Sequence, residues 1–267
     1  MKWRYILICI LAAGFCGCRQ QPAKSQAQST GKDTLSYVYK TIKKRAGDCG
    51  VKPDSSCTTA AIAYPAFAGQ KVLNDSLRNK LLQVFYFGDK EKKGASLEDL
   101  AQSVITSYQE DTSAIHYGMS YSLDLSAVVR RQDSSLLVLE LGGYAFSGGA
   151  HGSSQTFYVN WNTKSGKQIS LDDLFTDGYT PTLNNIAEKI FRNDEKLSDN
   201  ASLDHYFFDK GVFSLNNNFM ITPTGLDFLY NEYEIKSYAE GQTTLFIPYA
   251  QIKSLLRPKT VVSQYLK

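Results

Sequence analysis

The chain has 267 residues, of which 43% are hydrophobic and 21% are charged. This length and balance provide a buried core and exclude a disordered, collagen-like or coiled-coil protein. There are 29 lysines and arginines against 26 acidic residues, a formal net charge of +3. A dedicated nucleic-acid-binding protein normally carries a clustered basic face. We therefore expect no nucleic-acid partner.

The N-terminus has the pattern of an export signal. Lys2 and Arg4 precede an apolar run, Ile6–Phe15. This run is too short to cross a bilayer as a stable helix, because about 20 residues are needed for that. We therefore interpret it as the apolar region of a cleavable signal peptide.

The end of this apolar run resembles a bacterial lipoprotein signal. Gly17 stands directly before Cys18, and in such signals a small residue precedes the acylated cysteine. The alternative cysteine, Cys16, follows the bulky Phe15, so Cys18 is the predicted lipidation site. Residues 1–17 then form the signal peptide. A plain secretory peptide is the other interpretation.

The segment after the signal has little to bury. Residues 18–33 are mostly Gln, Ser, Lys, Ala and Gly, a composition typical of a flexible tether. Acyl chains on Cys18 would anchor the protein, since each buried CH₂ contributes ~0.8 kcal/mol. Because Arg19 follows this cysteine and no acidic run does, we expect a lipid-anchored protein of the bacterial cell envelope, on the outer membrane and facing the periplasm.

Two further cysteines follow Cys18, namely Cys49 and Cys57. The segment between them contains glycine, proline and serine and can turn back on itself. In an oxidising envelope a local disulfide is expected, worth ~2.5 kcal/mol in the chain-entropy model. No histidine or additional cysteine lies near at ligand spacing, which makes a metal site the weaker interpretation. Two free thiols are the remaining alternative.

Two amphipathic helices are predicted in residues 34–135, which we interpret as an N-terminal α/β module. In the first, the apolar residues recur at helical spacing; they are Leu73, Leu77, Leu81, Val84 and Phe85. The second follows Ser96, which opens a capping box with Asp99.

Alternating apolar and polar residues predict the strands. The predicted strands are residues 117–129, 136–141, 156–161, 219–221, 226–230, 233–235 and 245–247. Residues 130–135 are interpreted as a polar turn between the first two. In the third strand, Phe157, Val159 and Trp161 are expected on one face.

Residues 136–267 form the predicted C-terminal domain. Ser170 and Asp173 make a capping box around a short helix, Pro181 starts a longer helix, and Pro248–Leu256 closes the fold. Helices and antiparallel strands occur in blocks, without a βαβ rhythm. The predicted fold class is therefore α+β, with antiparallel sheets, packed amphipathic helices and two intimately associated subdomains.

The sequence lacks the common catalytic and cofactor motifs. His116, His151 and His205 form no H-E-x-x-H pattern, so a zinc hydrolase would lack its ligands. There is no phosphate-binding loop, no dinucleotide fingerprint and no G-x-S-x-G nucleophile elbow. We expect no metal and no cofactor.

The segment Gly142–Gly152 stands out, with five glycines in eleven residues between two predicted strands. Glycines allow positive φ and close backbone approach. The candidate binding residues are Tyr144, Ser147, Gly148, Gly149 and His151. In a catalytic interpretation Ser147 is a nucleophile and His151 its base. Since no acid partner is identifiable, we favour a recognition surface or a strand connection.

Several motifs carry a family resemblance. Phe219–Gly241 contains the patterns GL-x-F, YEI and YA-x-G, and resembles the extracellular C-terminal domain of unknown function of RsiV-type anti-sigma factors. Ser147–His151 and Leu171–Phe175 match two further stretches of that family. Upstream, Tyr64–Phe67 and the helix Asn74–Phe85 resemble the companion module of PdaC-type peptidoglycan deacetylases.

The resemblance implies envelope-facing recognition, because RsiV-type domains bind lysozyme. The sequence shows no transmembrane helix, no sigma-binding segment and no deacetylase catalytic domain, which argues against a sensor. We therefore expect a non-enzymatic, lipid-anchored envelope binding protein whose partner is lysozyme or peptidoglycan. The alternatives are an envelope hydrolase that uses Ser147 and His151, and a structural envelope component.

Overall fold

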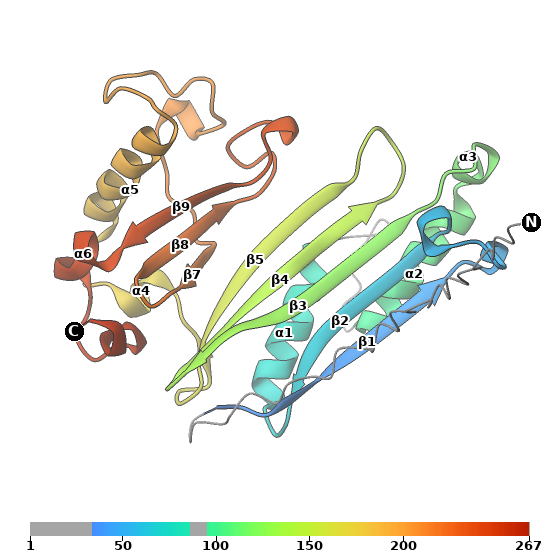
Figure 1. Ribbon diagram of the computed structural model, residues 1–267, viewed down its shortest axis with the longest axis horizontal. Coiled ribbons are helices and arrows are strands. Elements are labelled where there is room, and N and C mark those ends of the chain that lie inside the picture. Colours follow the sequence, from blue (N-terminus) through green and yellow to red (C-terminus); the bar gives the residue numbers. More distant parts are fainter. Residues whose placement is uncertain (1–33, 86–94, 267) are drawn as a thin grey trace, which may run out of the picture. The chain divides into compact units, whose positions relative to one another are not determined.

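The computed structural model describes residues 34–85 and 95–266 (Figure 1). The predicted signal peptide, the lipidation site Cys18 and the tether lie outside the described residues. These residues form one compact unit. This unit contains helices and two separate sheets, so the predicted α+β class is confirmed.

The larger sheet has six strands in chain order. They are β1 (Tyr37–Arg45), β2 (Thr59–Phe67), β3 (Ser122–Asp133), β4 (Leu136–Phe146), β5 (Ser153–Asn162) and β6 (Lys167–Gln168). All neighbours pair antiparallel except β2 and β3, which are parallel. A parallel pair needs a long crossover, and here three helices supply it: α1 (Lys71–Val84), α2 (Leu97–Glu110) and α3 (Thr112–His116). The first sheet therefore contains one βαβ connection that the sequence pattern did not predict.

Both predicted amphipathic helices are present and cover one face of this sheet (Figure 1). The apolar stripe of α1 is buried among residues of β2 to β5. At the start of α2, the Ser96 hydroxyl accepts from the Asp99 N–H, and the Asp99 carboxylate accepts from the Ser96 N–H. The predicted capping box is therefore confirmed, and it fixes where this helix begins.

The disulfide Cys49–Cys57 closes the connection between β1 and β2. The Cα atoms of the two cysteines lie 5.4 Å apart, within the usual range for a disulfide. Both side chains are buried in the first core. The crosslink therefore ties the edge strand β1 to its neighbour at the end of their shared ladder.

The smaller sheet is antiparallel, in the order β7 (Phe219–Ile221), β8 (Gly225–Tyr230) and β9 (Thr243–Pro248). The helices of this part of the chain are α4 (Leu171–Leu174), α5 (Thr180–Asp194) and α6 (Tyr249–Ile252). They pack with the sheet around a second core that is rich in phenylalanine. Pro181 lies in the first turn of α5, as predicted.

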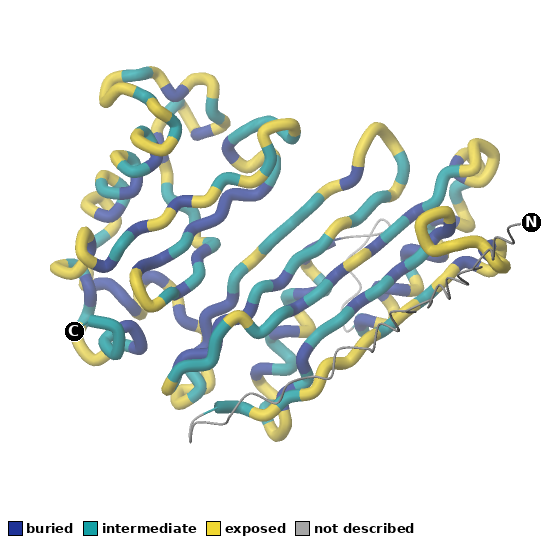
Figure 2. Tube along the Cα trace, viewed as in Figure 1, coloured by how far each residue is buried: buried dark blue, intermediate teal, exposed yellow. Residues whose placement is uncertain are grey.

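The first part of strand β4 serves both cores, since every residue from Leu136 to Leu139 is buried (Figure 2). Leu137 and Leu139 point into the first core, whereas Leu136 and Val138 belong to the second. The predicted boundary between residues 135 and 136 falls in the turn between β3 and β4. The strands on both sides of that boundary therefore belong to one sheet.

The two sheets are joined by asparagine side chains. Asn160 of β5 donates to the Phe219 carbonyl at 2.7 Å and accepts from the Ile221 N–H at 2.9 Å. Asn231 and Asn218 accept from backbone N–H groups on the part of β5 that β6 leaves unpaired. These amides occupy the hydrogen-bonding positions that another strand would fill.

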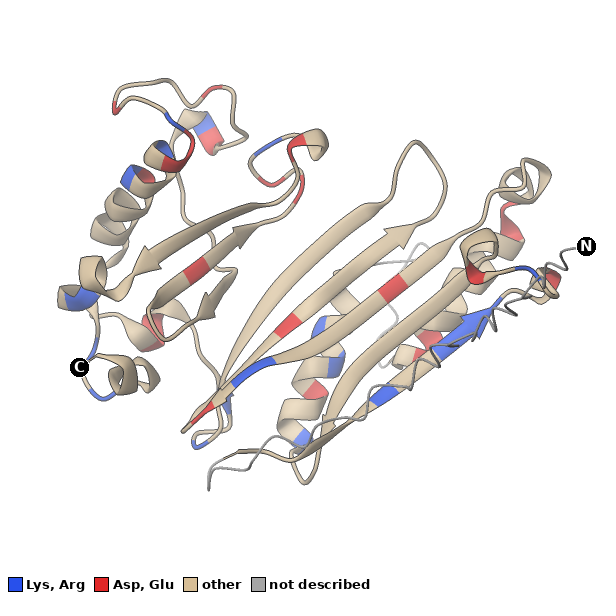
Figure 3. Cartoon of the chain, viewed as in Figure 1, with Lys and Arg blue, Asp and Glu red and all other residues tan. Residues whose placement is uncertain are grey.

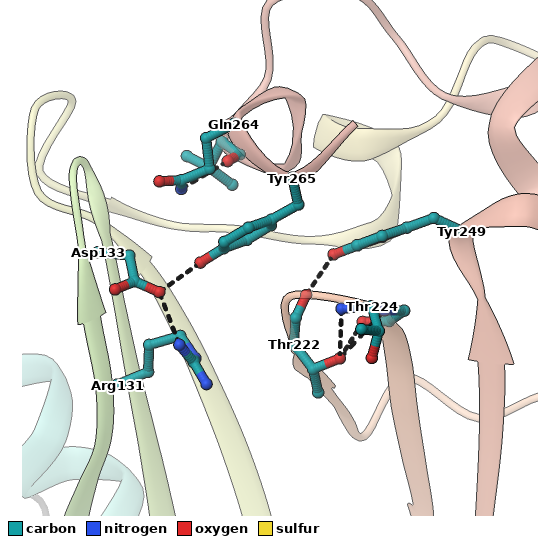
Figure 4. Close-up of polar contacts among 9 residues, drawn as sticks. Arg131, Asp133, Thr222, Thr224, Tyr249, Gln264 and Tyr265 are labelled. Atoms are coloured by element: carbon teal, nitrogen blue, oxygen red, sulfur yellow. Dashed lines mark hydrogen bonds and ion pairs between the residues drawn. The ribbon is translucent and has the colours of Figure 1, made fainter. Parts of the chain in front are cut away.

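A second connection involves the C-terminal segment (Figure 4). Tyr265 donates from its hydroxyl to Asp133 at 2.6 Å, and Arg131 donates to the same carboxylate oxygen at 2.9 Å. The Tyr265 ring stacks with Tyr249, whose hydroxyl donates to the Thr222 carbonyl. The end of the chain is thus held to the tip of the β3–β4 hairpin.

Three local predictions were wrong. The predicted turn at residues 130–135 is mostly strand, because a bulge between Val129 and Arg131 lets β3 continue to Asp133. The predicted strand at 117 begins only at Ser122, since Tyr117 caps the end of α3. The predicted strand at 233–235 is a turn, in which Tyr233 has a positive φ.

The edge strand β1 is strongly basic (Figure 3). Four of its nine residues are cationic: Lys40, Lys43, Lys44 and Arg45. Such charges discourage an exposed strand edge from pairing with another chain.

Within residues 34–85 and 95–266, no helix has the length and hydropathy of a membrane span.

Candidate functional site

The glycine-rich segment divides into a strand and a loop. Gly142 and Gly143 lie inside β4 and not in a connection between strands, which corrects the predicted position of the segment's first half. A Cβ atom at Gly142 would overlap the Gln155 carbonyl oxygen of β5, and one at Gly143 would overlap the Asp124 carbonyl oxygen of β3. These two glycines therefore allow β4 to lie close to both of its neighbours.

Tyr144 also lies in β4, and residues 147–152 form the β4–β5 loop. Gly148 and Gly149 both have positive φ, at 91° and 89°, a region that residues with a Cβ rarely adopt. Ser147 and His151, on either side of them, are exposed. The two glycines thus make a turn that presents both candidate side chains at the surface.

His151 is fixed by contacts from another part of the chain. Its ring stacks on Tyr238, with centroids 3.9 Å apart and planes inclined by 16°. Nδ1 lies 2.9 Å from the Gly152 carbonyl oxygen, and Nε2 lies 3.2 Å from the Tyr233 hydroxyl. Since a carbonyl only accepts, Nδ1 donates to it, and in the neutral ring Nε2 then accepts from the Tyr233 hydroxyl. Both ring nitrogens are therefore engaged.

Two further rings complete an exposed group. Tyr144 lies over Gly152, where a Cβ atom would overlap its ring, and it is 40% exposed. Tyr233 is 57% exposed and lies 5.9 Å from Tyr238, between ring centroids. We name the four residues Tyr144, His151, Tyr233 and Tyr238 the aromatic cluster. Burial, together with the charge of Glu232 and the neighbouring tyrosines, raises the pKa of Tyr238.

The backbone at Tyr233 is unusual. Its φ is 65°, in the left-handed region that non-glycine residues seldom occupy. Two hydrogen bonds within the turn hold this conformation, because Glu234 accepts from the Asn231 N–H through its side chain and donates to the Asn231 carbonyl through its backbone. Strained residues of this kind concentrate at functional positions. The turn therefore aims the Tyr233 ring toward the β4–β5 loop.

Tyr233 and Tyr238 were not predicted as site residues. Alternation placed Tyr233 in a strand, and the YA-x-G pattern served only to support the resemblance. In the structure the stretch Ser147–His151 meets that pattern, since His151 stacks on Tyr238. The pairing of these two motifs was the signal that could have identified the partners.

The loop does not have the geometry of a catalytic triad. Among the described residues no hydrogen bond joins Ser147 to His151, and no carboxylate contacts either nitrogen of His151. A base needs one free nitrogen toward the nucleophile and an orienting partner at the other. The described residues also contain no group of three or more His, Cys, Asp or Glu placed to hold a metal ion.

The fold and this surface define a two-sheet α+β protein that presents preorganised aromatic side chains. Residues 172–250 match the family described as "Protein of unknown function (DUF3298)". Residues 51–154 match the family described as "Deacetylase PdaC". These matches confirm the predicted combination of a C-terminal domain of unknown function with a PdaC-type module.

Solved structures of two DUF3298 proteins are similar to the chain. One, from Bacteroides fragilis NCTC 9343, superposes with a TM-score of 0.70 at 22% identity, over 88% of this chain and 99% of the other. The second, from Pseudomonas aeruginosa PAO1, gives 0.63 at 22% identity, over 85% and 96%. At this identity the likeness establishes the fold alone. No curated protein is significantly similar to the chain in sequence.

Proposed function

We propose that this protein is a non-enzymatic, lipid-anchored binding protein of the bacterial cell envelope, whose partner is lysozyme or peptidoglycan. The observation that carries the proposal is the aromatic cluster, in which three rings from two distant segments lie together and the Tyr144 ring lies over the neighbouring Gly152. Tyrosine supplies large contact area with little loss of conformational freedom, and it is enriched among residues that dominate binding energy.

The hydrogen bonds of His151 support a binding role over hydrolysis. A ring that donates to Gly152 and accepts from Tyr233 has no lone pair left to activate Ser147. Stacking on Tyr238 also holds the ring in one orientation before a partner arrives. Preorganisation of this kind lowers the entropic cost of association.

Two sequence features support the envelope location and the choice of partner. The apolar run Ile6–Phe15 and the lipidation site Cys18 have the pattern of an export signal followed by a lipid anchor. The resemblance to RsiV-type domains implies lysozyme as the first ligand to test. Ser147–His151, one of the stretches that carries this resemblance, contributes His151 to the aromatic cluster.

The test is calorimetric titration of the full chain with a c-type lysozyme, with solubilised peptidoglycan fragments as the parallel ligand. We expect a Kd below about 10 μM, which corresponds to about −7 kcal/mol. Replacing Tyr144 or His151 with alanine should weaken the binding of lysozyme by tenfold or more, which is the behaviour of a residue central to an interface.

The matched control is Tyr117→Ala. Tyr117 is 74% exposed at the end of α3 and makes no contact with the aromatic cluster. This variant should bind as the unaltered chain does. An absence of heat with both ligands, or an equal loss in the control, would contradict the proposal.

A further inference from the structure

A cleft of about 640 Å³ opens beside the unpaired edge of β5. Its floor includes Gln155 and Phe157, which point to the side of the sheet that carries the helices. Lys80 and Gln83 of α1 form one wall, and the segments 216–218 and 231–234 form the other. The volume lies within the range of small-ligand pockets, roughly 300–1,000 Å³. We name it the amide cleft.

Side-chain amides dominate the lining, at seven of the sixteen residues. Asn218 and Asn231 are already bonded to the edge of β5. Asn217, Gln83 and Gln168 make no side-chain hydrogen bond within the described part of the chain. Each free amide offers both a donor and an acceptor. The cleft therefore suits a ligand whose groups also donate and accept, as sugar hydroxyls do.

Phe157 provides an apolar surface within this polar cleft. It is 37% exposed, whereas Val159 and Trp161, on the same face of β5, are buried under the helices. An aromatic ring beside amides is suited to pack against the C–H face of a sugar while the amides bond its hydroxyl groups.

Among the described residues, Lys80 is the only cation that lines the cleft. It is partly buried, makes no ion pair within the described residues, and burial lowers its pKa. The two carboxylates on the opposite wall are engaged elsewhere, because Glu232 accepts from the Ser154 N–H and Glu234 accepts from Asn216. A carboxylate on a bound ligand would therefore find its charge partner at Lys80.

We propose that the amide cleft binds the glycan strand of peptidoglycan, with Phe157 beneath a sugar ring, Asn217 bonded to its polar groups, and Lys80 facing an acidic lactyl group. This inference rests on the proposed function, since the envelope location is what brings the chain to that glycan. It adds a site separate from most of the aromatic cluster, with which it shares only Tyr233.

The test uses two tetrasaccharides that differ only in acidic groups. Chitotetraose is the neutral probe, and the tetrasaccharide of alternating N-acetylglucosamine and N-acetylmuramic acid is the acidic one. Titrated into the full chain by calorimetry, both should bind, the acidic one about fivefold more tightly, because a partly exposed charge pair contributes modestly. Lys80→Met should abolish that difference without changing the affinity for chitotetraose.

Phe157→Ala and Asn217→Ala should each lower the affinity for both tetrasaccharides by at least fivefold. The matched controls are Lys189→Met and Asn185→Ala, two exposed residues of α5 outside the cleft, and neither should change sugar binding. Since Phe157 and Asn217 are exposed, both variants should keep the urea midpoint of the unaltered chain within the small range typical of surface substitutions.

Three outcomes would overturn the cleft assignment. Absence of sugar binding while lysozyme binds would reject the cleft and retain the proposed function. Sugar binding that is lost in Tyr144→Ala but unchanged in Phe157→Ala and Asn217→Ala would place the glycan on the aromatic cluster instead. Equal affinity for the two tetrasaccharides would reject the role given to Lys80.

Discussion

The contact between Tyr121 and Asp111 joins the start of β3 to the start of α3. The Tyr121 hydroxyl donates to Asp111 at 2.6 Å, and the other oxygen of that carboxylate accepts from the N–H groups of Ser113 and Ala114. Asp111 is thus both the N-cap of α3 and the partner of a buried phenol. Burial and this hydrogen bond raise the pKa of Tyr121 to about 12.

This shift predicts a loss of stability at alkaline pH. An unfolded tyrosine ionises near pH 10, whereas Tyr121 in the folded chain keeps its proton until about pH 12. Between these values the native state binds more protons than the unfolded state, so its contribution to stability is full below pH 10 and is lost as the pH rises toward 12. We expect the urea midpoint to fall over this window, and to fall less steeply in Tyr121→Phe.

The control for this experiment is Tyr117→Phe, since Tyr117 is exposed and its hydroxyl has no bonded partner in the described part of the chain. The urea midpoint of Tyr117→Phe should fall with pH in the same way as that of the unaltered chain. Because other tyrosines also have raised pKa values, among them Tyr206, the difference between the two variants measures the contribution of Tyr121. Identical slopes in both variants would contradict the assignment.

At this same scale, sequence could identify part of the aromatic cluster but not all of it. Tyr144 and His151 belong to a glycine-rich segment that is visible in the sequence. Their partners follow at positions 233 and 238, and the hydrogen bond from Tyr233 to His151 spans 82 residues. Such a contact depends on where the turn after β8 is placed by the second core, and no local pattern encodes that placement.

At the scale of elements, local signals predicted the helices well. The capping boxes at Ser96 and Ser170 are both present, and Pro181 lies where α5 begins. Strands were harder, because burial on a sheet depends on partners far along the chain. The alternation at 233–235 is the clearest failure, since Ile235 is buried there without strand geometry.

The connection from β2 to α1 depends on one asparagine. Asn74 accepts from the Phe67 N–H at 2.9 Å and donates to the Phe67 carbonyl at 2.8 Å. Together these bonds satisfy the last backbone groups of β2 and fix how α1 leaves the sheet. Asn74 begins the stretch Asn74–Phe85 that resembles the PdaC-type module, and its two bonds to Phe67 give it a structural role.

Asn74→Ala should therefore destabilise the protein. The substitution leaves the Phe67 N–H without a partner and leaves the Phe67 carbonyl with only the Gln70 N–H, 3.4 Å away. Such an orphaned group costs about 1–3 kcal/mol when it is shielded from water, and we expect the free energy of unfolding, measured in urea, to fall by about this amount. Asn79→Ala, at an exposed position on the same helix, should change it by less than about 0.5 kcal/mol. Equal effects in the two variants would contradict this role.

At the scale of the whole described unit, the two cores share a strand and a set of amides. β4 contributes alternate residues to each core, and β5 carries Asn160, whose side chain bonds to both ends of β7. The regions of the chain that match the two families therefore form one continuous hydrogen-bonded structure. Sequence predicted two intimately associated subdomains, but a boundary at residue 135 could not reveal that one sheet lies on both sides of it.

Asn160 supplies the sharpest test of this coupling. It is 2% exposed, and Asn160→Ala would leave the buried Phe219 carbonyl and Ile221 N–H without partners. The expected loss in the free energy of unfolding is about 2–5 kcal/mol, since two shielded backbone groups are affected. If the amide couples the two sheets, far-UV circular dichroism and Trp161 fluorescence should shift to lower urea together. A lower midpoint seen by only one of these probes would mean that the two sheets unfold independently, and an unchanged midpoint in both would show that the amide contributes nothing to their attachment.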